Sequence, residues 1–254
     1  MEQGERPRAR LYLATSLAVA SIRLGAERAH YLRHVLRMSV GDKLAVFNAT
    51  DGECEARVGT FGKGWCDIAI GAQRRAPRPE SDLWLLFAPI KRTRIDGLIE
   101  TATELGVSEF RPVFTQHTAM TRIKLERLKA IAIEAAEQCE RLTVPEIHPP
   151  QSLADALCAW PPGRLLLLCD ETGSGEPIGH LLTRQKPRDG FAILIGPEGG
   201  FSAAELDGLR KLPFVTPVGL GPRVLRADTA ALAALSVVQA LAGDGRMPTP
   251  GRAQ

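Results

Sequence analysis

The stretch "ILIGPEGGFSAAEL", residues 193–206, decides the fold. It begins as an apolar run typical of a buried strand and ends in a pattern typical of a helix start. Ser202 and Glu205 have the spacing of a capping box, in which each side chain binds a backbone amide at the start of a helix. The cap does not explain the intervening Gly-Pro-Glu-Gly-Gly, so we predict a strand, a ligand-binding loop and a helix.

A second loop of the same kind, "GLGPRVLR" at residues 219–226, begins where the strand-like run "VTPV" ends. In an open parallel sheet, ligands bind beyond the carboxyl ends of the strands, where backbone amides and helix starts converge. Both loops hold that position in the sequence. We therefore expect the two loops to face one ligand.

Strands alternate with helices over the last two thirds of the chain. Apolar runs precede helical patterns, as in "LWLLFAPI", "EFRPVF", "RLLLLCD", "FAILI" and "VTPVGL". This alternation predicts an α/β domain, residues 83–243, with a parallel sheet covered by helices on both faces. The apolar final helix, from about Asp228 to Leu241, is expected to be buried in the core or in a subunit interface. Residues 244–254 are predicted to form a flexible tail.

The first part of the chain, residues 1–73, has a different pattern. Short β-like runs are separated by glycine and aspartate turns, and one helix is expected at "AERAHYLRHVLRM". These features predict a small β-barrel or sandwich. Residues 74–82 are polar and hold two prolines, which favour a linker between the two domains.

The loops lack the residues that bind phosphate. No lysine follows Gly200 as a P-loop requires, and the Gly-x-Gly-x-x-Gly dinucleotide fingerprint is absent. Glu198 would repel a phosphate, but it suits a ligand with a positive centre or with hydroxyl and amine groups. S-adenosylmethionine has these groups, and Gly199 would let the backbone approach an adenosine closely. The sequence therefore favours S-adenosylmethionine as cofactor.

Composition narrows the class of protein. Hydrophobic residues make up 44% and charged residues 24%, as in soluble globular proteins, and no apolar run approaches the roughly 20 residues of a membrane span. The five cysteines and five histidines are scattered, so we expect no metal site and a reducing cytoplasm. Residues 1–80 carry a net excess of four positive charges, which hints at a polyanion bound by the N-terminal domain.

Several blocks together resemble a known family. "IGPEGGFSAAEL" and "GLGPRVLRADTAALAAL" are similar to the C-terminal signature of the RsmE-type ribosomal RNA methyltransferases, a branch of the SPOUT class. "ATELGV" at 102–107 and "EAAEQCERLTVPEI" at 134–147 resemble the family's other blocks, and "HYLRHVLRMSVGDKLAVFN" resembles its PUA-like RNA-binding domain. The resemblance covers nearly the whole chain in the right order.

The resemblance implies methylation of N3 of a uridine in small-subunit ribosomal RNA, with S-adenosylmethionine as methyl donor. It also implies a homodimer, a trefoil knot in the C-terminal domain and the small ribosomal subunit as partner. The sequence departs from the family at "LRADTA", where Leu-Arg-Thr-Glu-Thr-Ala is commoner, and at "EQCER", where a Gln-Ser-Gly-Arg-like run is usual. The first departure leaves Asp228 open between a catalytic role and a helix cap.

Candidate site residues follow from the loops and the resemblance. Arg223 and Arg226 are expected to hold the RNA backbone or to stabilise negative charge on the uracil ring, and Asp228 or Glu198 is a candidate base. Basic residues at an early helix and at the start of a later one are candidate RNA ligands. The predicted cofactor-binding residues are Leu194, Ile195, Gly196, Pro197, Glu198, Gly199, Gly200, Leu220, Gly221, Leu225 and Thr229; the predicted RNA-binding residues are Arg10, His30, Arg33, His34, Arg37, Lys91, Arg92 and Arg94.

Two alternatives remain open at this point. The same fold could methylate another RNA target, such as transfer RNA or a ribose hydroxyl. The chain could also be a non-catalytic RNA-binding factor in ribosome assembly, although the intact glycines and arginines of both loops argue against a loss of chemistry.

Overall fold

The computed structural model describes residues 7–120, 122–170, 172–185 and 190–248, except for the side chains of Arg92 and Thr93. Two compact units are present. One holds the chain up to Pro79 together with Ala136–Val144, and the other holds Glu80–Ala135 and Pro145–Pro248. The segment Ala136–Val144 thus belongs to the first unit, whereas the sequence pattern places it within the second domain.

The first unit is built on a five-stranded sheet, which confirms the small β-rich fold expected there. Its strand order is β1-β3-β4-β5-β2, with β1 and β3 parallel and the other neighbours antiparallel. The described strands include no pair between β1 and β2, so closure into a barrel is not seen. The elements are β1 (Arg10–Tyr12), β2 (Ser21–Leu24), α1 (Ala26–His30), the π-helix η1 (Tyr31–Val35), β3 (Lys43–Asn48), β4 (Gly52–Gly62) and β5 (Trp65–Arg75).

Arg10 holds the segment 136–144 in this unit. Its guanidinium pairs with the Glu53 carboxylate at 2.7 Å and donates to the carbonyl oxygens of Ala136, Glu137 and Arg141. The two charged side chains are 9% and 6% exposed, and burial is tolerable because the pair is closely hydrogen-bonded. Phe47, Ala136 and Leu142 add an apolar contact. Arg10 is therefore a structural residue of the first unit.

The second unit is an α/β sandwich around a parallel sheet, as predicted. The strand order is β11-β13-β10-β12-β6-β7-β8, and the short β9 pairs with β7. Strands β6 (Leu83–Phe87), β10 (Leu165–Cys169) and β12 (Phe191–Ile195) are buried along their whole length, because helices cover both faces. The other strands are β7 (Glu109–Phe114), β8 (Glu146–Ile147), β9 (Gln151–Ser152), β11 (Glu176–Pro177) and β13 (Val215–Gly219).

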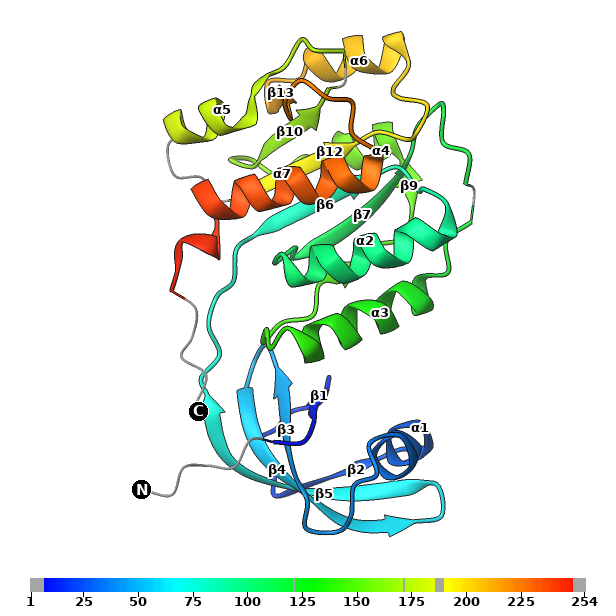
Figure 1. Ribbon diagram of the computed structural model, residues 1–254, viewed down its shortest axis with the longest axis vertical. Helices are drawn as coiled ribbons and strands as arrows, with labels where there is room; N and C mark the ends of the chain where they lie inside the picture. The colour runs from blue at the N-terminus through cyan, green and yellow to red at the C-terminus, as the bar shows by residue number, and fades with distance from the viewer. Residues whose placement is uncertain (1–6, 121, 171, 186–189, 249–254) are drawn as a thin grey trace. The chain divides into compact units, whose positions relative to one another are not determined.

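The helices divide between the two faces of this sheet (Figure 1). Leu153 of α4 and Leu206 of α6 pack against one set of alternating strand residues, which includes Leu86 and Leu194. Helices α2 and α7 contact each other, and α7 lies against β12 on the opposite face. The helices are α2 (Arg92–Glu104), α3 (Leu125–Gln138), α4 (Leu153–Cys158), α5 (Ile178–Arg184), α6 (Ala203–Arg210), α7 (Ala227–Ala242) and the 3-10 helix η2 (Asp244–Arg246).

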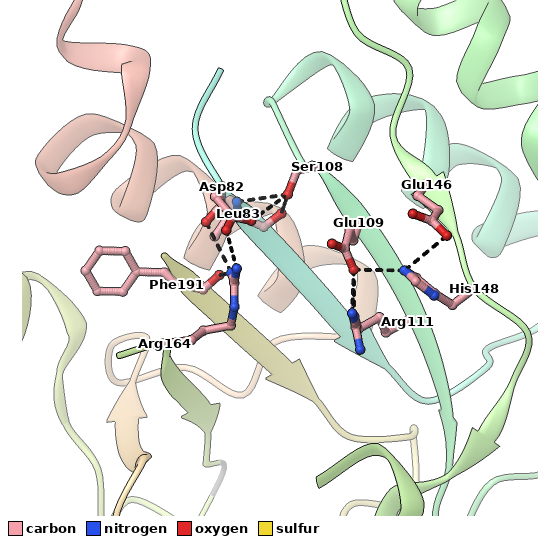
Figure 2. A network of polar contacts seen from close by, with 9 residues as sticks. All are labelled: Asp82, Leu83, Ser108, Glu109, Arg111, Glu146, His148, Arg164 and Phe191. Carbon is pink, nitrogen blue, oxygen red and sulfur yellow. Dashed lines mark hydrogen bonds and ion pairs between the residues drawn. The ribbon is translucent and has the colours of Figure 1, made fainter. Parts of the chain in front are cut away.

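A network of polar side chains ties the strand starts together (Figure 2). Arg164 donates to the carbonyl oxygens of Asp82 and Phe191 and pairs with the Asp82 carboxylate. It thereby joins the starts of β6, β10 and β12. At the start of β7, Glu109 accepts from Arg111 and lies 2.8 Å from Nε2 of His148. The amino edge of the sheet is thus closed by structural contacts, which leaves the carboxyl edge for a ligand.

The boundaries of the units differ slightly from the expected ones. Strand β5 continues to Arg75, so the first residues of the predicted linker extend the sheet. Asp244 starts η2, and its backbone amide donates to Gln239 and Ser81, so the predicted tail is ordered at its beginning. Residues 249–254 of that tail lie outside the described residues.

Candidate active site

A cavity of about 680 Å³ lies at the carboxyl edge of the parallel sheet. The loops after β12 and β13 line it together, as the sequence predicts for two loops that face one ligand. A third wall comes from the end of β10. The lining residues are Cys169, Asp170, Gly173, Ile195, Gly196, Pro197, Glu198, Gly199, Gly200, Val218, Gly219, Leu220, Gly221, Pro222, Arg223, Val224, Leu225, Arg226, Ala227 and Ala230.

The loop after β12 needs its glycines for shape. Gly200 has φ +69°, and its amide donates to the Pro197 carbonyl at 2.9 Å, which closes a tight turn. A Cβ on Gly196 would lie 2.8 Å from the ring of Phe201, a side chain buried in the core. The predicted capping box is confirmed, since Ser202 accepts from the Glu205 amide and Glu205 accepts from the Ser202 amide.

The loop after β13 carries two arginines over the cavity. Gly221 has φ +106° and turns the chain, and Arg226 is the N-cap residue of α7. Arg223 and Arg226 both line the cavity and are exposed. They are thus positioned to contact both a ligand in the cavity and a partner outside it.

Asp170 forms the third wall, which the sequence reasoning missed. Its carboxylate is fully buried and accepts from Ser174, from the Thr172 amide and from Arg210 of α6 at 2.6 Å. Burial by itself raises the pKa of Asp170, but these hydrogen bonds outweigh burial and hold the pKa well below its usual range. Its position directly after β10, beside β12 and β13, is the pattern that could have identified it.

The structure brings most predicted cofactor residues to the cavity, with two exceptions. Leu194 is fully buried within β12, and Thr229 lies in the first turn of α7; neither lines the cavity. Their contact with a cofactor is therefore not supported by the cavity. The remaining predicted residues of both loops line one space, and their contact with a cofactor stays a prediction.

The two candidate bases differ in position. Asp228 does not line the cavity, and its carboxylate accepts from the Thr229 amide at 3.0 Å in the first turn of α7. The predicted cap by Asp228 does not form, because Arg226 is the N-cap residue of α7. An acid in the first turn still stabilises the helix start through the helix dipole, which favours a structural role for Asp228. Glu198 lines the cavity and pairs with Arg94 at 3.3 Å.

A turn after β7 lies against the loop after β12. The Gln116 amide donates to Glu205 at 2.8 Å, and Nδ1 of His117 lies 3.1 Å from the carbonyl oxygen of Gly200. The sequence gives no periodic pattern at these positions, and sequence reasoning did not single them out.

The predicted RNA-binding residues have mixed outcomes. The guanidinium of Arg10 is taken up by Glu53 and backbone carbonyls, which favours a structural role over the predicted binding of RNA. The predicted basic face with period i, i+3, i+4, i+7 does not form as such, because the helix becomes a π-helix and ends before Arg37, which has φ +52°. His30 and His34 do meet, with ring centroids 4.7 Å apart.

The other predicted RNA-binding residues are Arg33 and the basic residues at the start of α2. Arg33 lies over the ring of Phe61 at 5.5 Å, and Lys91 is the exposed N-cap residue of α2. Arg94 pairs with Glu198. The side chain of Arg92 lies outside the described residues. Binding of RNA by His30, Arg33, His34, Arg37, Lys91 and Arg94 stays a prediction.

Other features of the described chain bear on its class. Its histidine, cysteine, aspartate and glutamate side chains form no group of three or more that could hold a metal ion. None of its helices combines the length and the hydrophobicity that a membrane span requires.

Comparison with known proteins identifies the family. A family model described as an RNA methyltransferase domain matches residues 77–239, and one described as the RNA methyltransferase PUA domain matches residues 24–67. The chain belongs to this RNA methyltransferase family. The predicted α/β fold with a PUA-type N-terminal unit is confirmed, whereas the trefoil knot stays a prediction.

Individual relatives of this RNA methyltransferase match over nearly their full length. It is 34% identical to Ribosomal RNA small subunit methyltransferase E of Rickettsia conorii, over 91% of this chain and 95% of the relative. The same-named enzyme of Neisseria gonorrhoeae, solved with S-adenosyl methionine, is 26% identical with TM-score 0.82 over 93% and 98% of the two chains. A Legionella pneumophila protein solved with bound SAM is 30% identical with TM-score 0.82 over 94% and 100%.

Proposed function

We propose that this protein transfers the methyl group of S-adenosylmethionine to N3 of a uridine in small-subunit ribosomal RNA. The observation that carries the proposal is the cavity shared by the two glycine loops, with Arg223 and Arg226 on its wall. Family membership and the names of the relatives support methyl transfer to small-subunit ribosomal RNA. The choice of N3 of a uridine rests on the resemblance of the sequence to its family.

The cavity suits a sulfonium nucleoside. Its volume is typical of small-molecule sites, and much of its wall is backbone from glycine-rich loops that can approach a ligand closely. The wall carries both acidic residues, Asp170 and Glu198, and basic ones, Arg223 and Arg226, which suits a ligand with a positive centre and a carboxylate. We infer that residues 195–200 together with Leu220, Gly221 and Leu225 hold this cofactor.

Bound S-adenosylmethionine supplies an electrophilic methyl group on a positively charged sulfur. The chain must hold the uridine in line and stabilise the anion that forms when N3 loses its proton. Arg223 and Arg226 carry permanent positive charge beside the cavity and suit both tasks. Of the two candidate bases, Glu198 is the one whose residue lines the cavity, so we assign proton removal to Glu198 rather than to Asp228.

We also propose a cytoplasmic homodimer that binds the small ribosomal subunit. The resemblance of the sequence to its family supports the dimer, and the partly exposed apolar residues Leu232, Val237 and Leu241 of α7 offer a surface for it. Cys54, Cys66 and Cys158 form no disulfide, which suits a reducing compartment.

Mass spectrometry of nucleosides from small-subunit ribosomal RNA tests the proposal. We expect a strain that lacks the protein to lose one N3-methyluridine, and the intact gene to restore it. An unchanged N3-methyluridine content would contradict the assignment. Loss of a different modified nucleoside, or of one in transfer RNA, would favour another RNA target. Calorimetry without any binding of S-adenosylmethionine would favour a non-catalytic assembly factor.

A further inference from the structure

The loop after β12 is held from outside by residues that do not line the cavity. Strand β6 lies between β12 and β7 in the sheet, so the chain that leaves β7 must reach across one strand position to meet this loop. It does so in a turn made by residues 115–118, which we call the 115–118 turn. Two contacts from this turn reach the loop and the helix behind it.

The 115–118 turn has a fixed shape of its own. The Thr118 amide donates to the Thr115 carbonyl at 3.1 Å, and the Thr115 amide donates to the Thr118 hydroxyl at 2.9 Å. The two threonine hydroxyls also lie 2.9 Å apart. These local bonds fix the direction in which Gln116 and His117 project.

Glu205 links the turn to the start of α6. One of its carboxylate oxygens accepts from the Gln116 amide at 2.8 Å, and the other accepts from the Ser202 amide at 2.8 Å. Burial raises the pKa of Glu205, but the amides of Ser202 and Gln116 outweigh it, so the pKa lies below its usual value. The charged carboxylate of Glu205 therefore joins the 115–118 turn to the start of α6, with one oxygen bound to each.

His117 contacts the glycine loop itself. A carbonyl oxygen can only accept, so the 3.1 Å contact with Gly200 requires the proton on Nδ1 of His117. A Cβ added to the neighbouring Gly199 would lie 3.4 Å from the Cβ of His117. His117 therefore lies close against the loop. Gly199 and Gly200 both line the cavity.

From these contacts we infer that His117 and Glu205 are positioning residues for the cofactor, which fix the backbone of residues 199–200 in the shape that binds it. The inference rests on the proposed function, because it assigns the loop to S-adenosylmethionine. A loop that is already ordered loses less conformational freedom on binding, so its supporting contacts raise affinity without touching the ligand.

Calorimetric titration with S-adenosylmethionine tests the role of His117. We expect His117→Ala to raise the dissociation constant about 5-fold, as for one lost hydrogen bond, with little change in melting temperature. At saturating cofactor its kcat should stay near that of the wild type. His117→Asn, whose amide can donate in place of Nδ1, should recover most of the affinity. His180→Ala is the matched control, since His180 is an exposed histidine of α5 in the same unit and does not line the cavity.

A second pair of variants separates positioning from folding. Ser202→Ala and Glu205→Gln both weaken the cap of α6, so both should lower the melting temperature. The two backbone amides bind different oxygens of Glu205, and glutamine replaces one of these oxygens by a donor NH2 group, so one amide loses its acceptor. Only Glu205→Gln should therefore also weaken cofactor binding. Equal cofactor affinity in these two variants would overturn the role of Glu205.

The outcomes distinguish this inference from the proposed function. Wild-type affinity in His117→Ala, with the wild-type protein binding S-adenosylmethionine normally, overturns the positioning role alone. Equal losses in His117→Ala and His117→Asn, with equal drops in melting temperature, assign His117 to folding and also overturn it. A wild-type protein that binds no S-adenosylmethionine overturns the proposed function and the inference with it.

Discussion

At the scale of single residues, the glycines of the cavity carry the clearest prediction. Gly199 lines the cavity, and a Cβ there would already lie 3.4 Å from His117. Gly199→Val adds branches that must displace His117 or enter the cavity, so we expect it to abolish binding of S-adenosylmethionine in calorimetry. Gly208→Val on the exposed side of α6, where nothing lies within 4 Å of a Cβ, is the control. Near-normal affinity in Gly199→Val would contradict the assignment.

Arg226 tests the division between cofactor and substrate contacts. It lines the cavity from the exposed start of α7. We expect Arg226→Ala to keep cofactor affinity and to lower kcat on ribosomal RNA by about 100-fold or more, as for loss of a group that stabilises developing negative charge. Parallel losses of affinity and turnover would instead reassign Arg226 to the cofactor.

Single residues were predictable from sequence where their role is local. Ser202 and Glu205 form a capping box within one turn of helix, and the glycine loops follow their strands directly. The contacts of Arg10 could not be predicted, because its partners Glu53 and Ala136 lie far from it in the sequence. Gln116 and His117 were missed for the same reason, since their partners at Gly200 and Glu205 lie more than 80 positions away.

At the scale of elements, Asp170 and Arg210 join the loop after β10 to α6. Because the folded-state pKa of Asp170 lies well below its usual value near 4, its stabilising contribution is present above about pH 4 and is lost as the pH falls further. Asp170→Asn should therefore lower the melting temperature at neutral pH. The difference from the wild type should shrink progressively as the pH falls below about 4 in thermal melts; a difference at about pH 2 as large as the one at neutral pH would contradict this account.

Arg164 carries a separate prediction at the other edge of the sheet. It joins the starts of three strands (Figure 2). Its guanidinium also lies over the Trp84 ring, 3.5 Å from the ring centroid. Arg164→Lys keeps the charge but loses the planar, many-donor geometry, so we expect a loss of about 1–3 kcal/mol in the free energy of unfolding. Cofactor affinity should stay unchanged, because the cavity is at the carboxyl edge. Denaturant unfolding measures the change in stability, and calorimetry measures the affinity for the cofactor. An unchanged free energy of unfolding would contradict the structural role of Arg164.

Elements with strong periodicity were predictable, and short ones were not. The buried strands β6, β10 and β12 and the helix α7 follow from continuous apolar runs and helical spacing. The two-residue strands β8, β9 and β11 have no period to detect. The π-helix η1 altered the spacing of His30, Arg33 and Arg37, because a wider turn changes which side chains share a face.

At the scale of the whole molecule, charge and family membership bear on RNA binding. The first 80 residues carry the positive excess, and the PUA-type model matches within them. With roughly four phosphate contacts, RNA affinity should fall on the order of 100-fold between about 50 and 200 mM salt. Binding of S-adenosylmethionine should change far less over the same range. Salt-independent RNA binding would exclude a phosphate-dominated interface.

The central claim is that the two glycine loops together bind the methyl donor. A crystal structure of this protein with S-adenosylmethionine tests it most directly. We predict that the nucleoside occupies the cavity between residues 196–200 and 220–226, in contact with backbone from both loops. A ligand bound elsewhere, or in contact with one loop alone, would contradict the account.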